Sequence, residues 1–280
     1  MNNEKVWLVT GASKGLGLVL VQKLLNKGYK VAATSRNKEA LLSAVGEDNN
    51  FLPLQVDLLS EQSVLSAINN IVQKFGKIDV IVNNAGYGQI GTLEELTDRE
   101  VRQNFEVNVF GCLNVIRNAM PHLRANKGGS IFNISSIAGF IGTFPGWGIY
   151  CATKYAVVGF TEALAAEVKS FGISATIVYP GYFRTNFLQK NSLSRPKKPI
   201  SDYTEARELE LKHINEIQGN QLGDPEKAAT VLIEVAENGN PPQHLFLGQD
   251  SYDMAHAKLE QVQKDMTAYQ ALATATAYDR

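Results

Sequence analysis

Short apolar runs alternate with helix-type segments along most of this chain. The runs are apolar on both faces, as in Ile78-Asp79-Val80-Ile81-Val82, which is typical of parallel strands covered by helices on both sides. The expected strands are residues 6–10, 30–35, 51–56, 78–83, 130–135, 173–179 and 244–247, and the expected helices are 16–26, 38–45, 61–75, 99–120, 150–171 and 225–238. This alternation predicts an α/β fold with a doubly wound parallel sheet of about seven strands.

Two segments interrupt the alternation. Residues 186–222 are polar and charged, with a helical pattern at 204–217, and are too long for a plain connection. Long insertions of this kind are usually functional loops, so we expect a helical lid. Residues 251–275 carry apolar side chains at helical spacing and predict a C-terminal helical extension that packs on the body or on a partner subunit. We expect residues 1–280 to form a single domain.

The composition excludes several classes of protein. The 27 Lys and Arg against 28 Asp and Glu leave no basic excess for nucleic-acid binding. Cys112 and Cys151 are too few for a disulfide framework or a zinc site, so we expect two buried thiols and no metal. Neither a signal peptide nor a run of about 20 apolar residues is present. A cytoplasmic protein without a membrane segment is expected.

A glycine-rich turn joins the first expected strand to the first expected helix, in Thr10-Gly11-Ala12-Ser13-Lys14-Gly15-Leu16-Gly17. Glycines at such a turn permit positive φ and let a pyrophosphate approach the backbone. The helix N-terminus supplies unpaired N–H groups for the phosphates. The turn therefore predicts a dinucleotide site.

The end of the second strand indicates which dinucleotide is bound. NAD enzymes place a carboxylate there for the adenosine 2′-hydroxyl, whereas this strand ends Thr34-Ser35-Arg36-Asn37. Arg36 and the nearby Lys14 complement the charge of a 2′-phosphate. The expected cofactor is NADP (NADPH).

A serine, a tyrosine and a lysine provide the expected chemistry. Tyr150 and Lys154 are four residues apart and share one helix face, and Ser136 follows the fifth strand. Carbonyl reduction by hydride transfer builds negative charge on oxygen, which must be stabilised and protonated. A Lys ammonium and a cationic nicotinamide would lower the pKa of the phenol toward working pH, and Ser136 would hold the substrate oxygen.

These ordered motifs resemble those of the short-chain dehydrogenase/reductase (SDR) family, in the branch with a Thr-Gly-x-x-x-Gly-x-Gly turn and a Tyr-x-x-x-Lys site. The resemblance covers about residues 5–248. It implies a Rossmann-type sheet with helices on both faces. One spacing differs, because Ser136 lies 14 positions before Tyr150, one more than usual. Ser135 is thus an alternative, although the Ile-Ala-Gly that follows favours Ser136.

The resemblance also implies a role for each matching residue. Asp57 would meet the adenine ring, and Asn83-Asn84-Ala85-Gly86 would steady the sheet and contact the adenosine ribose. Asn108 would position a water in the proton relay to Lys154, and Pro180-Gly181 with Thr185 would seat the nicotinamide. The expected catalytic residues are Asn108, Ser136, Tyr150 and Lys154. The expected cofactor-binding residues are Gly11, Ser13, Lys14, Gly15, Leu16, Gly17, Ser35, Arg36, Asp57, Leu58, Asn84, Ala85, Gly86, Tyr150, Lys154, Pro180, Gly181 and Thr185.

Aromatic residues gather in the loops expected around the nicotinamide, which suggests an apolar substrate pocket beneath the lid. They are Phe140, Phe144, Trp147, Tyr182, Phe183 and Phe187.

The sequence thus predicts an NADP(H)-dependent carbonyl reductase type of enzyme. It would interconvert a lipophilic secondary alcohol and its ketone or aldehyde, with Tyr150 as general acid/base. One alternative is a 3-oxoacyl carrier-protein reductase, and another is a non-catalytic NADP(H)-sensing protein. The family resemblance implies a homodimer.

Overall fold

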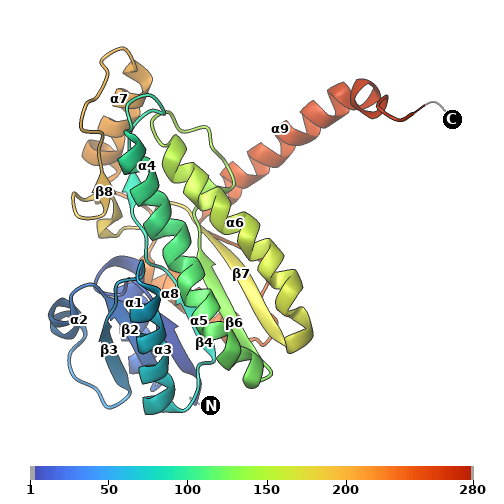
Figure 1. Ribbon diagram of the computed structural model, residues 1–280. Coiled ribbons are helices and arrows are strands. Elements are labelled where there is room, and N and C mark those ends of the chain that lie inside the picture. The colour runs from blue at the N-terminus through green and yellow to red at the C-terminus, as the bar shows by residue number, and fades with distance from the viewer. Residues whose placement is uncertain (1–3, 279–280) are drawn as a thin grey trace.

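Seven parallel strands form one sheet in the computed structural model, which describes residues 4–278 (Figure 1). Their spatial order is β3-β2-β1-β4-β6-β7-β9. The strands are β1 (Val6–Val9), β2 (Lys30–Ser35), β3 (Phe51–Gln55), β4 (Val80–Asn83), β6 (Gly129–Ile134), β7 (Ile173–Pro180) and β9 (His244–Leu247). The predicted doubly wound sheet is confirmed. The order in which strands are added to the sheet reverses between β1 and β4, and sheets of this type bind ligands beyond the carboxyl ends of the strands at that point.

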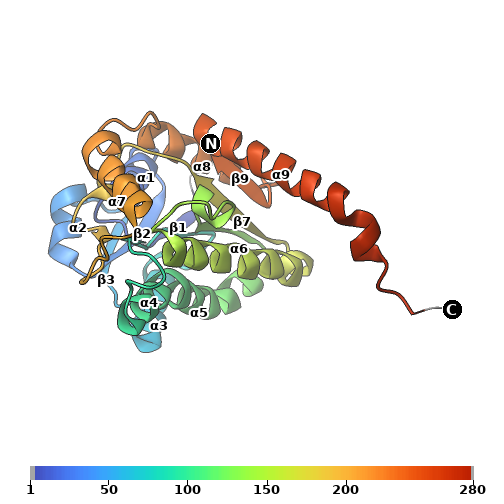
Figure 2. The ribbon, with the colours of Figure 1, turned by 90° about the horizontal axis from the view of Figure 1, so that it is seen from above.

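Helices cover both faces of the sheet, as the view from above shows (Figure 2). One layer holds α1 (Gly15–Asn26), α2 (Lys38–Val45) and α8 (Pro225–Glu237), and the other holds α3 (Glu61–Phe75), α5 (Gly111–Ala125) and α6 (Gly148–Val168). In β1, Trp7 and Val9 point into the first layer while Val6 and Leu8 point into the second. All four β1 residues are buried, which explains why this strand is apolar throughout.

The segment expected as one helix at 99–120 is interrupted. It consists of α4 (Asp98–Phe105), a π-helical turn (Glu106–Phe110) and α5. Thr97 and Glu100 form a capping box that starts α4. Such π-turns are frequent at functional sites, and this one contains Asn108.

The predicted lid, residues 186–222, is built from several short elements. A 3-10 turn (Asn186–Leu188) leads to β8 (Leu193–Ser194), then to α7 (Thr204–Lys212) and a π-helical turn (His213–Ile217). Strand β8 pairs in parallel with β5 (Gly88–Gln89). The sequence pattern did not predict this pair, because two residues are too few to show a period.

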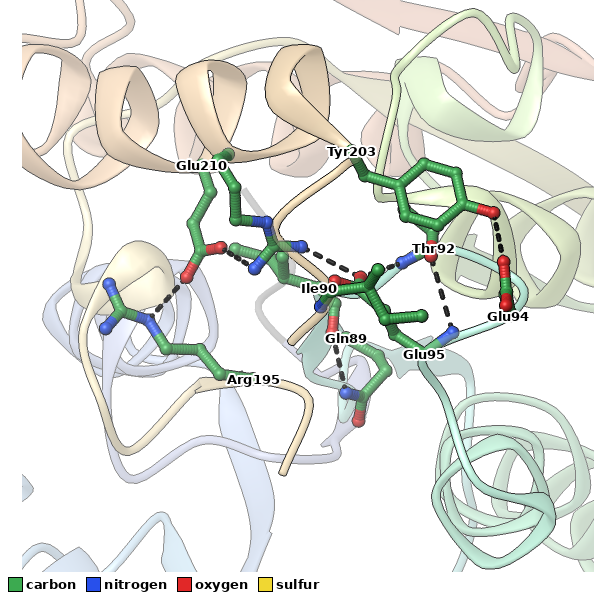
Figure 3. A network of polar contacts seen from close by, with 10 residues as sticks. Gln89, Ile90, Thr92, Glu94, Glu95, Arg195, Tyr203 and Glu210 are labelled. Carbon is green, nitrogen blue, oxygen red and sulfur yellow. Dashed lines mark hydrogen bonds and ion pairs between the residues drawn. The ribbon is translucent and has the colours of Figure 1, made fainter. Parts of the chain in front are cut away.

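A buried carboxylate joins the lid to the body (Figure 3). Glu95 has a fully buried side chain, which accepts hydrogen bonds from Ile200 N at 2.7 Å and from Arg207 Nη2 at 2.9 Å. Arg207 also contacts Glu210 at 2.6 Å. Burial acts to raise the pKa of Glu95, but backbone hydrogen bonds from Thr92 and Ile200 and the Arg207 charge bring that pKa below its ordinary value.

The last helix, α9 (Gln249–Thr274), begins directly after β9. Its first turns pack on the body through Ser251 and Ala255, and its remainder projects away from it in both views (Figures 1 and 2). Within residues 4–278, no helix is both long and apolar enough to cross a bilayer.

The contacts of Glu95 predict a large effect on stability. Substitution Glu95→Ala leaves Ile200 N and Thr92 N without their acceptor and leaves Arg207 with Glu210 as its remaining carboxylate partner. Losing this buried acceptor is expected to lower the free energy of unfolding by about 3 kcal/mol. The exposed neighbour Glu94, which accepts a hydrogen bond from Tyr203, is the matched control. Glu94→Ala should change the free energy of unfolding by about 0.5 kcal/mol or less. Denaturant titration measures both values, and similar losses would contradict the anchoring role.

Candidate active site

A cavity of about 1140 Å³ opens at the carboxyl ends of the central strands. Most of the residues predicted from the sequence line it: Gly11, Ser13, Lys14, Gly15, Leu16, Ser35, Arg36, Asp57, Leu58, Asn84, Ala85, Gly86, Ser136, Phe144, Trp147, Tyr150, Lys154, Pro180, Gly181, Tyr182, Phe183, Thr185 and Phe187. Three predicted residues do not line it. They are Gly17, Asn108 and Phe140.

The glycine-rich turn is fastened to the loop that follows β4. The Asn84 side chain donates hydrogen bonds to Thr10 O at 3.0 Å and Gly11 O at 3.1 Å. Gly11 has φ +65°, and a Cβ there would lie 2.7 Å from Ala85 Cα. Gly17 lies beneath the turn, where a Cβ would be 2.5 Å from Asn84 Nδ2. Gly17 therefore packs the helix on the strand and does not face the cavity.

The start of α1 leaves backbone donors free for phosphates. Lys14 occupies the N-cap position without a capping side chain, so the first N–H groups of the helix have no side-chain partner there. Such groups, together with the helix dipole, form an anion site. The chemistry of this turn fits the pyrophosphate of a dinucleotide.

Two cations stand at the end of the cavity next to β2. Lys14 Nζ donates a hydrogen bond to Asn191 O at 2.9 Å, and burial together with the Arg36 charge lowers the pKa of Lys14. Neighbouring like charges are relieved by an anion between them. Asp57 also lines this end, with its carboxylate accepting a hydrogen bond from Leu59 N at 3.0 Å.

Helix α6 carries Tyr150 and Lys154 one turn apart. Lys154 Nζ lies 5.7 Å from the centre of the Tyr150 ring and donates a hydrogen bond to Ile134 O at 2.9 Å. The two candidate serines have different partners. Ser135 is buried and donates to Lys154 O at 3.0 Å, whereas the Ser136 hydroxyl lies within hydrogen-bonding reach of the Tyr150 phenol. The geometry therefore favours Ser136 for contact with a substrate.

Burial dominates the ionisation of this group of residues. It raises the pKa of the Tyr150 phenol, and the Ser136 hydrogen bond offsets part of that rise. It lowers the pKa of Lys154 to about 8. The expected lowering of the Tyr150 pKa requires a cationic nicotinamide beside Lys154 and stays a prediction.

Asn108 lies behind the cavity, not on its surface. Its Oδ1 accepts a hydrogen bond from Tyr87 N at 3.0 Å, and its Nδ2 donates to Tyr87 O at 3.0 Å and to Thr153 Oγ1 at 3.1 Å. These contacts tie the π-helical turn to α6. A role for Asn108 in placing a relay water stays a prediction.

The aromatic wall differs from the prediction at Phe140. The Phe140 ring packs edge-on to Tyr179 and Phe246, beneath the start of α9. It fills this satellite core because η2 (Ile137–Gly139), the 3-10 turn just before it, points the chain toward α9. The other five predicted aromatics line the cavity.

His213 is a cavity residue that sequence reasoning missed. It is buried, and its Nδ1 lies 2.7 Å from Leu209 O while its Nε2 lies 2.9 Å from the Tyr182 hydroxyl. Burial lowers the pKa of His213. Because a carbonyl only accepts, Nδ1 carries the proton, and the Tyr182 hydroxyl donates to Nε2. A single histidine inside a helical pattern gave no signal for this pairing.

Asp250 is a second residue without a sequence signal. Its Oδ2 accepts a hydrogen bond from Tyr182 N at 2.6 Å, and a Cβ on Gly181 would lie 2.3 Å from its Oδ1. Asp250, in the first turn of α9, thus fixes the loop that carries Pro180, Gly181 and Tyr182.

Both cysteines are free and buried, as expected. Across residues 4–278, no three His, Cys, Asp or Glu side chains are grouped closely enough to hold a metal ion.

The buried Lys154 predicts how stability depends on pH. Its pKa falls from 10.5 to about 8 on folding, so below pH 8 folding must bury an ammonium. Between these two values only the unfolded chain keeps the proton, and the free energy of unfolding rises with pH. Lys154→Met removes this dependence. At pH 7 the free energy of unfolding of the variant should exceed that of the wild type by about 1–3 kcal/mol. This difference should shrink as pH increases from 8 to 10. Denaturant titrations across this range measure the difference, and an advantage that grows with pH would contradict the assignment.

Known proteins match this chain over most of its length. Residues 5–196 match the short chain dehydrogenase family. A 3-ketodihydrosphingosine reductase from Bacteroides thetaiotaomicron is 36% identical over 87% of this chain and 88% of its own. A short-chain dehydrogenase from Streptomyces avermitilis has a similar structure, with a TM-score of 0.88 and 33% identity over 98% of this chain and 99% of its own. The structure of ElxO with NADP bound has a TM-score of 0.72 and 30% identity over 87% of this chain and 96% of its own. The chain belongs to the short-chain dehydrogenase family of oxidoreductases.

Proposed function

We propose that this protein is an NADP(H)-dependent oxidoreductase that interconverts a lipophilic secondary alcohol and its ketone, or an aldehyde, by hydride transfer. The observation that carries the proposal is the grouping of Ser136, Tyr150 and Lys154 in one cavity that also contains the glycine-rich turn. The turn fits a dinucleotide, and the three side chains fit an oxygen that gains charge beside it.

Each of the three side chains has a distinct task in the reduction. The nicotinamide supplies the hydride when it is bound. Burial keeps the Tyr150 phenol protonated, so the phenol can donate its proton to the developing alkoxide. Ser136 donates a hydrogen bond to the same oxygen. Lys154, held by Ile134 O, places its amine beside the phenolate that remains and stabilises it.

Tyr150→Phe tests this mechanism. The variant keeps the ring but has no proton to give, so turnover should fall by roughly 10²–10⁴-fold, the usual contribution of general acid–base catalysis. NADPH affinity should stay within about threefold, which calorimetry measures. Tyr155→Phe is the matched control, because this tyrosine lies on the same helix with a half-exposed ring whose hydroxyl bonds to Phe140 O. Turnover of the Tyr150 variant within tenfold of the wild type would refute the acid role.

Lys14 and Arg36 support NADP over NAD. Both cations line the cavity at the end of β2, where the strand offers no carboxylate for a 2′-hydroxyl. Burial and, to a smaller extent, the Arg36 charge lower the pKa of Lys14, and a bound 2′-phosphate would offset the repulsion between the two cations. The NADP bound to the similar protein ElxO is consistent with this choice.

Arg36→Ala tests the cofactor assignment. A hydrogen bond to a charged phosphate contributes about 1.5–3 kcal/mol, so the dissociation constant of NADPH should increase roughly 10- to 100-fold. The constant for NADH should change less than about threefold. Lys38→Ala serves as the control, because Lys38 is an exposed cation two residues away that does not line the cavity. An equal loss for both cofactors would remove the 2′-phosphate assignment.

The walls of the cavity support a lipophilic substrate with a polar end. Phe144, Trp147 and Phe187 supply apolar surface, and the Tyr182 hydroxyl, which donates to His213, keeps only acceptor lone pairs for a ligand. The relative named 3-ketodihydrosphingosine reductase acts, by its name, on a ketone. A panel of ketones, alcohols and a 3-oxoacyl carrier-protein substrate, run with NADPH, separates this proposal from a carrier-protein reductase. NADPH binding without any turnover would instead indicate a sensing protein.

A further inference from the structure

Most of α9 lies free of the body that it leaves. Ser251 and Ala255 are its buried residues, and every residue from 259 to 274 is exposed. Both views show this half of the helix projecting from the body (Figures 1 and 2). Isolated helices of this length are marginal in water, because most helix stability comes from packing an apolar face. We therefore expect residues 259–274 to be stabilised by packing on another surface.

The exposed half carries a regular apolar stripe. Apolar residues recur at alternating steps of three and four, which is the heptad pattern of a helix that packs on another helix. The pattern starts at Tyr252 and Ala255, which contact the body. The exposed stripe consists of Leu259, Val262, Met266, Tyr269 and Ala273. Met266 is 64% exposed and Tyr269 is 65% exposed. The positions on the far side of the helix, such as Glu260, Lys264 and Thr267, are polar.

The charges beside the stripe indicate what covers it. Lys258 and Asp265 occupy the same heptad position, each directly before a stripe residue. In an antiparallel pair of α9 helices, Lys258 of each copy faces the partner's Asp265. In a parallel pair these charges would face the partner's Gln263 and the partner's Gln270 instead. The mixed charges also lack the Lys/Arg excess that anionic membranes attract.

We propose that α9 forms an antiparallel two-helix coiled coil with α9 of a second copy of this chain. The stripe is the contact surface, and the Lys258–Asp265 pairs set its direction. The extension is shared with the Streptomyces avermitilis structure, which covers 98% of this chain, whereas ElxO covers 87%. This inference does not depend on the proposed function, since it concerns a surface outside the cavity.

Sedimentation velocity on the full chain tests the pairing. Met266→Glu places a charge in the stripe and should lower the assembly by one step, from dimer to monomer or from tetramer to dimer. Lys264→Glu changes a charge on the far side and should leave the assembly unaltered. Circular dichroism and NADPH binding show that each variant is folded. An assembly unchanged by Met266→Glu, or a wild-type chain that is still monomeric at about 100 µM, midway between millimolar and micromolar dissociation constants, would overturn the proposal.

A charge swap tests the direction of the helices. Lys258→Glu and Asp265→Lys alone each bring like charges together and should weaken association about tenfold or more. The double variant restores opposite charges and should recover most of the affinity, which a parallel pair would not do. Flotation with vesicles of phosphatidylcholine and phosphatidylserine tests whether a membrane, and not a second copy, covers the stripe. If the wild type is monomeric in solution and binds the vesicles through Met266, a membrane covers the stripe and the proposal fails.

Discussion

Two reciprocal hydrogen bonds tie helix α6 to the end of strand β6. Lys154 Nζ donates to Ile134 O, and the Ser135 hydroxyl donates to Lys154 O. Because Tyr150 lies one turn earlier on the same helix, these bonds also fix the phenol relative to Ser136. The 3-10 turn η2 also packs closely on this junction, since a Cβ on Gly139 would lie 2.3 Å from Ser135 Oγ and 2.8 Å from Lys154 O. The relative placement of the three candidate catalytic side chains thus depends on this junction.

The junction places an amine where water is excluded, which opposes folding. The apolar layers on the two faces of the sheet supply the stability that allows it, since β1 and one face each of α1, α3 and α8 are buried. A strained or desolvated group commonly persists at a functional site because the surrounding structure enforces it. Here the same desolvation keeps Tyr150 protonated and brings the pKa of Lys154 closer to neutrality.

The sequence was most informative where the fold imposes a regular pattern. Strands buried on both faces show as unbroken apolar runs, and Gly11, Tyr150 and Lys154 lie at fixed spacing near element ends. It was least informative about contacts between distant segments. The Glu95–Arg207 pair joins residues 112 positions apart, and the His213–Tyr182 pair likewise has no local period. Phe140 was misplaced for a related reason, because an aromatic residue near a site fits a core equally well. The π-helical turn at Asn108 escaped because one widened turn leaves the helical spacing almost unchanged.

The seat of the lid has a consequence for how ligands reach the cavity. Arg207 of helix α7 forms an ion pair with the fully buried carboxylate of Glu95, and strand β8 is hydrogen-bonded to β5. An outward rotation of residues 186–222 would break both attachments at once, the Arg207–Glu95 ion pair and the β5–β8 pairing. Substrates would therefore reach the cavity while the lid stays attached to the body. The width of the entrance, and not a hinge motion of the lid, then decides which molecules are admitted.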